Sequence, residues 1–213
     1  MRNEKTPIAA EGFPFIAAAV AVTVLCLLLA WKIPACIALA VTLFIVFFFR
    51  NPERRIPGDE NAVLAPADGR IIFLGDVHEE RLGGEVRKIS IFMSVFNVHV
   101  NRVPVSGTVI DSFYTRGKFL DVRDERATFE NEQKGLLVEA SSGARIMVVQ
   151  VAGLIARRIV CYLEKGDHMV RGKRYGLIRF GSRLDIYLPK NSRLNVTMGE
   201  KTVAGETILG YLQ

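Results

Sequence analysis

The chain has 213 residues, enough for one domain of common size and an additional segment. Apolar residues make up 50% of it and the net charge is +6. No recognition helix or aromatic-basic ribonucleoprotein motif accompanies this charge, so we expect no nucleic-acid partner. Basic residues around 157–158 and 171–183 favour an anionic membrane surface, although an ordinary solvated face has the same composition. The three cysteines lack a pairing framework and metal-ligand spacing, which indicates buried thiols in a reducing compartment.

The apolar excess lies at the N-terminus. Residues 13–31 form an uncharged run, about 28 Å long as a helix at ~1.5 Å per residue, enough to cross a hydrocarbon core of ~30 Å. Residues 35–49 form a second uncharged run, about 22 Å long, after an interruption by Lys-Ile-Pro. A signal peptide is the competing interpretation, but the second run and the lack of a convincing small-residue cleavage site argue against it. We therefore expect residues 1–50 to be a membrane-anchoring hydrophobic hairpin.

Three arginines follow the second run directly, at positions 50, 54 and 55. By the positive-inside rule they place the following domain on the cytoplasmic side of the cell membrane. Whether the second run crosses the bilayer completely stays open.

The rest of the chain, 51–213, begins with a polar linker at 51–61 and continues as short strands separated by glycine-bearing turns. Helical periodicity is weak, and the stretch 121–133 fits a helix or a mobile loop equally well. We predict a mainly β domain in an α+β chain, with a compact barrel- or sandwich-like architecture. The predicted strands are 69–74, 88–95, 107–113, 136–139, 144–151, 159–163 and 184–188.

Two turns occur twice within this domain. Pro-x-x-Gly precedes an apolar strand at 66–69 and again at 104–107, and Gly-acid-x-x-Val-x-Gly occurs at 166–172 and 199–205. These repeats resemble the hairpins of lipoyl-like barrel domains. They support a compact β architecture, and a fold does not by itself determine function.

Gly181 and Ser182 stand at the entrance of the last predicted strand. Leu184, Ile186 and Leu188 alternate with polar residues, which is typical of a half-buried strand. Because glycine has no Cβ, a neighbouring hydroxyl can approach its carbonyl closely, and attack by Ser182 would turn the amide into an ester. A Gly-Ser pair before a strand is more often an ordinary turn, so the motif alone leaves both interpretations open.

A serine hydroxyl becomes nucleophilic when a base shares its proton, and the common base is a histidine that a carboxylate orients. His78 lies among acidic residues in an expected surface turn, and His168 lies at an expected hairpin tip, so a solvated role is favoured for both. His99 lies in an apolar segment, where a structural histidine is the default. Asp68 precedes a glycine and is an ordinary turn residue on local chemistry.

Three stretches together resemble the phosphatidylserine decarboxylases, and more narrowly their short, archaeal-type form. The resemblance covers the chain from about residue 51 to the C-terminus. The stretches are Pro-Ala-Asp-Gly at 66–69, FMSVFNVHVNRVP at 92–104, and 166–189 with its central Gly-Ser.

The resemblance implies a proenzyme that cuts itself between Gly181 and Ser182. The products would be a large chain 1–181 and a small chain 182–213, which remain associated. The resemblance is compatible with a homo-oligomer and leaves the oligomeric state open. Ser182 would become a pyruvoyl group that forms a Schiff base with phosphatidylserine, so that the lipid loses carbon dioxide and becomes phosphatidylethanolamine. Neither an external cofactor nor a metal is implied.

The resemblance also assigns supporting roles. Asp68 and His99 match residues of the self-cleavage machinery, and Asp68 would orient His99. Longer members have a second histidine where this chain has Arg102, so whether His99 serves both cleavage and decarboxylation stays open. The segments 117–120 and 130–132 also match the short form, as either a loop that covers the substrate or a structural loop. Arginines near Ser182 are candidates to meet the lipid phosphate.

Two other classes of protein compete with this interpretation. A membrane-anchored lipoyl-like carrier or adaptor without catalysis would present a lysine at a hairpin tip, and the turn at 166–170 has none. A serine hydrolase that used Ser182 would need a Gly-x-Ser-x-Gly elbow and a βαβ pattern, and neither is present. The sequence therefore predicts a decarboxylase, with the carrier as the alternative.

Overall fold

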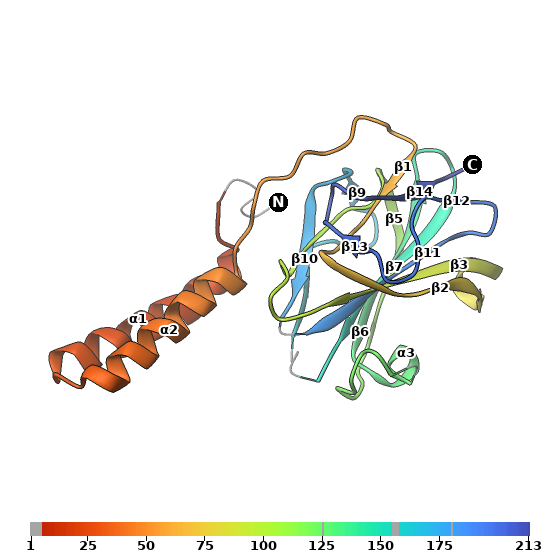
Figure 1. Cartoon of the computed structure of the whole chain (residues 1–213). Coiled ribbons are helices and arrows are strands. Elements are labelled where there is room, and N and C mark those ends of the chain that lie inside the picture. Colours follow the sequence, from red (N-terminus) through yellow and green to blue (C-terminus); the bar gives the residue numbers. More distant parts are fainter. Residues whose placement is uncertain (1–5, 125, 155–157, 180) are drawn as a thin grey trace. The chain divides into compact units, whose positions relative to one another are not determined.

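The computed structural model describes residues 6–124, 126–154, 158–179 and 181–213. The chain divides into two compact units, Met1–Glu53 and Arg54–Gln213. Helices make up most of the first unit and strands most of the second (Figure 1).

The first unit is a hairpin of two apolar helices, α1 (Phe13–Leu28) and α2 (Lys32–Phe48), preceded by the 3-10 turn η1 (Ala10–Gly12). The helical stretch Ala10–Leu28 is long and apolar enough to cross a membrane, and α2 is shorter. The predicted interruption at 32–34 is wrong: α2 begins at Lys32, because a proline is tolerated in the first helical turn, where backbone N–H groups have no intrahelical partner.

The second unit consists mainly of antiparallel strands, which confirms the predicted mainly β class. Its largest sheet has eight strands in the order β13-β2-β3-β11-β7-β6-β5-β9 and is curled (Figure 1). Two three-stranded sheets have the orders β1-β14-β12 and β4-β10-β8. The elements are β1 (Ala62–Leu64), β2 (Gly69–Glu79), η2 (Glu80–Leu82), β3 (Gly84–Met93), β4 (Val100–Arg102), β5 (Gly107–Thr115), α3 (Ala127–Glu130), β6 (Gln133–Ala140), β7 (Arg145–Ala152), β8 (Ile159–Cys161), β9 (His168–Met169), β10 (Arg174–Ile178), β11 (Ser182–Pro189), β12 (Arg193–Leu194), β13 (Lys201–Thr202) and β14 (Ile208–Tyr211).

All the predicted strands are present, and several are longer than predicted. Strand β2 continues through the expected surface turn at His78, and the turn lies instead at 80–83. The strands that the sequence did not predict are short, with two to five residues each, and such lengths carry too little alternation to be recognised. Within the described residues of 121–133, the only helix is α3.

The repeated turns have equivalent places in the large sheet. Gly69 begins β2 and Gly107 begins β5, and at each position an added Cβ would lie 2.1–2.2 Å from a carbonyl oxygen of the neighbouring strand. Thr202 of β13 pairs with Gly69, and Met169 of β9 pairs with Gly107. The sheet therefore has two similar halves, which meet between β11 and β7.

Strand β11 lies at the centre of this sheet, hydrogen-bonded to β3 on one side and to β7 on the other. The prediction that β11 is half-buried is wrong, because both of its faces are covered. One face belongs to the main hydrophobic core and the other carries charged groups that are paired with one another. The core face contains Leu184, Ile186 and Leu188, and the opposite face contains Arg183, Asp185 and Tyr187.

Candidate active site

Ser182 is the first residue of β11, which confirms its predicted place at the strand entrance, and it is fully buried. It pairs with Met93 of β3 and with Ala152 of β7. Its Oγ donates a hydrogen bond to the sulfur of Met93, 3.5 Å away. Since a thioether is a weak acceptor, the hydroxyl is oriented without being strongly bound.

Gly181 precedes the strand with a φ of 61°, in the left-handed region that favours glycine. Its carbonyl oxygen approaches Gly153 so closely that a Cβ added there would lie 2.2 Å from it. A cavity of about 250 Å³ opens beside Gly181, and its apolar lining is Phe92, Val95, Val122 and Leu154. The peptide bond between Gly181 and Ser182 thus lies where side chains leave room for an approaching group.

A buried polar chain reaches the sulfur that holds Ser182. Asn101 Nδ2 donates to the Met93 sulfur at 3.7 Å, and Gln150 Nε2 donates to Asn101 Oδ1 at 2.8 Å. Both amide side chains are almost completely buried. Sequence reasoning did not single out Asn101 or Gln150, although Gln150 was visible as the one polar residue in the apolar run 146–151.

His99 is buried directly before β4. Its Nδ1 lies 3.0 Å from the carbonyl oxygen of Asn97. A carbonyl can only accept, so Nδ1 carries the proton of the neutral ring and Nε2 carries the lone pair that can act as a base. The preceding turn is held by Asn97, whose Oδ1 accepts from the backbone N–H and the hydroxyl of Ser94, each at 2.8 Å.

Asp68 lies in the turn before β2. One guanidinium nitrogen of Arg54 lies 2.9 Å from each of its carboxylate oxygens, and the N–H of Ala204 donates to Oδ1 at 2.8 Å. The contacts described for Asp68 therefore do not include His99. The role of Asp68 in orienting His99 stays a prediction.

Arg183, the residue after Ser182, points to the opposite face of β11 because side chains alternate along a strand. The expectation that it meets a lipid phosphate is not supported, since its guanidinium is almost fully buried and engaged by protein groups. Nε and Nη2 bind Asp185 at 2.8 and 3.0 Å, Nη1 binds the carbonyl of Val122 at 2.7 Å, and Nη2 binds Thr128 Oγ1 at 2.8 Å. Arg183 thus holds the described residues of 120–131 at Val122 and Thr128, and Val122 lines the cavity at Gly181.

The remaining candidates lie apart from these contacts. His78 and His168 are exposed, as expected for solvated residues. Arg102 donates to the carbonyl of Gly172 at 2.9 Å, and burial, together with the neighbouring Arg54 and Arg174, lowers its pKa to about 10. Within the described part of the chain, no group of three or more His, Cys, Asp or Glu residues could hold a metal ion.

The predicted buried thiols are only partly found. Cys26 is buried and Cys161 is half-buried, but Cys36 is exposed on α2. The apolar surface of α2 explains this exposure, since the helix carries many exposed apolar side chains besides Cys36.

The candidate site lies in a mainly antiparallel β domain, where a Gly-Ser peptide opens a central strand and Ser182 is fully buried. Comparison with known sequences gives the family. The family model described as phosphatidylserine decarboxylase matches residues 41–210. A relative from Geotalea uraniireducens is 69% identical over 212 residues, and one from Geobacter metallireducens is 69% identical over 217 residues. Each match covers 100% of both chains, and each relative is named phosphatidylserine decarboxylase proenzyme. The chain therefore belongs to the phosphatidylserine decarboxylase family.

Proposed function

We propose that this protein converts phosphatidylserine to phosphatidylethanolamine and carbon dioxide after cutting itself between Gly181 and Ser182. The observation that carries the proposal is the Gly181 carbonyl beside a cavity, directly before the fully buried Ser182, in a chain whose relatives at 69% identity are named proenzymes. The family membership also favours an enzyme over the carrier or adaptor that the sequence left as an alternative.

In the proposed cleavage, Ser182 Oγ attacks the carbonyl carbon of Gly181. The hydroxyl proton passes to a base, for which His99 Nε2 is the candidate, and the amide nitrogen leaves with a proton, so that an ester replaces the amide. Loss of the Cα proton of residue 182 then breaks the Cβ–O bond. Chain 1–181 then ends in a carboxylate that keeps Oγ, and residue 182 becomes a dehydroalanine. Its imine tautomer is hydrolysed by water, which releases ammonia and leaves a pyruvoyl group.

The surroundings of Ser182 fit the small, uncharged pyruvoyl group that would result. Its strand neighbours Met93 and Ala152 carry no charge, and the amide of Asn101 lies beside the Met93 sulfur. When present, a pyruvoyl group supplies a carbonyl that reacts with a primary amine and draws electrons from the bond to a departing carboxylate. The apolar cavity at Gly181 would receive the lipid, and the sheet around residue 182 would exclude water from the reacting atoms.

The membrane part of the proposal has separate support. The stretch Ala10–Leu28 has the length and apolar character of a membrane span, and Arg50 and Arg55 follow the second helix. We infer that the N-terminal hairpin anchors the protein in the cell membrane, with residues 51–213 on the cytoplasmic side. A substrate that stays in the bilayer would then be available to the anchored enzyme.

The test is intact mass spectrometry of the wild-type protein beside Ser182→Ala, with Ser142→Ala as a control in the exposed turn between β6 and β7. We expect two chains from the wild type and from Ser142→Ala, with the smaller chain carrying a pyruvoyl group in place of serine. Ser182→Ala should remain a single chain.

The same samples are then given phosphatidylserine with a labelled carboxylate, and released carbon dioxide is counted. Release by both the wild type and Ser142→Ala, but not by Ser182→Ala, supports the full proposal. An uncut wild type would refute self-processing, whereas a cut wild type that releases no carbon dioxide would refute the substrate.

A further inference from the structure

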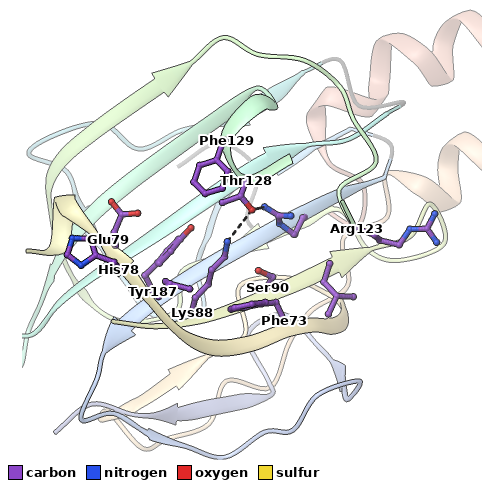
Figure 2. A pocket seen from close by; sticks show the side chains of 12 residues that line it. Phe73, His78, Glu79, Lys88, Ser90, Arg123, Thr128, Phe129 and Tyr187 are labelled. Carbon is purple, nitrogen blue, oxygen red and sulfur yellow. Dashed lines mark hydrogen bonds between the residues drawn. The ribbon is translucent and has the colours of Figure 1, made fainter. Parts of the chain in front are cut away.

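A second cavity, of about 370 Å³, lies on the face of β11 opposite to Ser182. We call it the outer pocket. It is bounded by side chains from β2, β3 and β11 and by the segment that contains α3 (Figure 2). Neither the cleavage nor the decarboxylation proposed above uses it.

The floor of the outer pocket contains a buried cluster of three charges. Lys88 Nζ lies 3.1 Å from Asp185 Oδ2, and Arg183 Nε lies 2.8 Å from Asp185 Oδ1. Two cations therefore share one carboxylate, so this cluster carries a net charge of +1 while all three side chains are less than a tenth exposed. A buried excess charge of this kind favours a ligand of opposite sign.

Polar groups at the floor have hydrogen-bonding capacity left over. An ammonium group has three N–H donors, and those of Lys88 meet Asp185 and, at 3.4 Å, Thr128 Oγ1. Among the described residues, no partner is seen for its third donor. Ser90 is 1% exposed, lines the pocket beside Lys88, and its hydroxyl has no hydrogen-bond partner in the described part of the chain (Figure 2). Burial lowers the pKa of Lys88, and a bound anion would oppose that shift.

The walls of the outer pocket are aromatic. Lys88 Nζ lies 5.6 Å from the ring centroid of Phe73 and 5.3 Å from that of Tyr187. Phe129 of α3 also lines the pocket and is 82% exposed, so its ring is available to an apolar ligand (Figure 2). The other titratable groups on the lining are His78, Glu79 and Arg123.

We propose that the outer pocket binds an amphiphilic anion. Its carboxylate or phosphodiester would accept hydrogen bonds from Lys88 and Ser90, and its apolar part would lie against Phe73 and Phe129. Arg123 lines both the outer pocket and the cavity at Gly181, so an occupant would contact the segment that forms one wall of the candidate active site. This proposal does not depend on the reaction proposed above.

Photo-crosslinking of the full-length protein in neutral detergent tests the proposal. The probes are a fatty acid and a phosphatidylglycerol, each with a diazirine in an acyl chain, and labelled peptides are mapped by mass spectrometry. We expect labelling of the peptides that contain Phe73 or Phe129, with suppression by excess octanoate but not by octyl glucoside. The probe that labels these peptides identifies the source of the anion, a free fatty acid or a phospholipid.

Two variants of the outer pocket test separately how its charge and its apolar walls contribute to binding. Lys88→Met should reduce this labelling about tenfold or more, as expected for loss of a charge-assisted hydrogen bond, whereas Lys190→Met, at an exposed lysine beyond the end of β11, should not. Phe129→Ser, at a site too exposed to matter for folding, should also reduce it and serves if Lys88→Met does not fold. Labelling confined to α1 and α2, equal suppression by octyl glucoside, or unchanged labelling in both pocket variants would each overturn the proposal.

Discussion

Arg54 places one guanidinium nitrogen 2.9 Å from both carboxylate oxygens of Asp68, in a pair whose side chains are 9% and 14% exposed. The pair joins the segment before β1 to the turn before β2. Asp68 Oδ1 also accepts from the N–H of Ala204. The aspartate that the family resemblance connects with self-cleavage is therefore also a structural anchor.

The first prediction concerns this anchor. Asp68→Ala should lower the free energy of unfolding by about 3–5 kcal/mol, because it leaves the charge of Arg54 buried without its partner. Asp68→Asn should cost less, since the amide oxygen can still accept from Ala204. The measurement is the urea midpoint of each variant in detergent, together with the fraction of chain that is cut. An Asp68→Ala protein as stable as the wild type but uncut would show that Asp68 acts only in the chemistry.

The second prediction concerns the carbonyl of Gly181. Gly153→Ala should slow self-cleavage by a factor on the order of 10 to 100, because its methyl group would lie 2.2 Å from that oxygen and must displace the bond to be broken. Gly58→Ala is the matched control, since its added Cβ meets no atom within 4 Å. The rate is read as the appearance of the small chain during synthesis of each variant. Equal rates for the two alanine variants would contradict the prediction.

The third prediction concerns Thr128 in the segment 120–131, whose Oγ1 accepts hydrogen bonds from Arg183 and Lys88. Thr128→Val keeps the shape of the side chain but removes the acceptor, at a cost of about 1–3 kcal/mol for the donors left unpaired. Local opening should then be roughly tenfold more frequent, so trypsin should cut this segment faster. The cuts to be followed are those after Arg123 and Arg126.

Thr108→Val, at an exposed threonine of β5, is the control for this substitution. We expect its digestion pattern to match that of the wild type. If Thr128→Val is also digested like the wild type, the hydroxyl does not hold the segment in place.

The fourth prediction concerns Cys161. Burial raises the pKa of its thiol from 9.0 to about 11. Alkylation of Cys161 in the native protein should therefore be slow at pH 8 and should increase up to about pH 11, because only the thiolate reacts. In the unfolded protein the thiol ionises first, so its contribution to stability is complete below pH 9 and is lost as the pH rises toward 11. Iodoacetamide labelling read by mass spectrometry checks this, and half-maximal labelling of the native protein near pH 9 would contradict it.

The sequence was sufficient to predict the elements that carry a long or regular pattern. The helical hairpin followed from two uncharged runs, and β11 followed from the alternation of Leu184, Ile186 and Leu188. Short strands such as β9 and β13 were missed, because two residues have no period. They exist because they pair with Gly107 and Gly69, which is a tertiary effect.

The candidate site was predicted in part. Ser182 and Gly181 are where the motif required, but the partners of the charged residues depend on strand register, which local sequence does not contain. Lys88 meets Asp185 only because β3 pairs with β11 in the observed register. Alternation along β11 already placed Arg183 on the face opposite to Ser182, but its burial against Val122 and Thr128 could not be recognised in the sequence.

The position of β11 determines how the protein could unfold and reassemble after a cut before Ser182. β11 pairs with β3 and β7, β13 pairs with β2, and β14 pairs with β1. Strands formed by residues after Gly181 are therefore hydrogen-bonded to strands formed by residues before it. A cut before Ser182 would make the protein a complex of two polypeptides, and reassembly after unfolding would then depend on protein concentration. Such a protein folds once, as a single chain, and its later persistence is set by how slowly it unfolds.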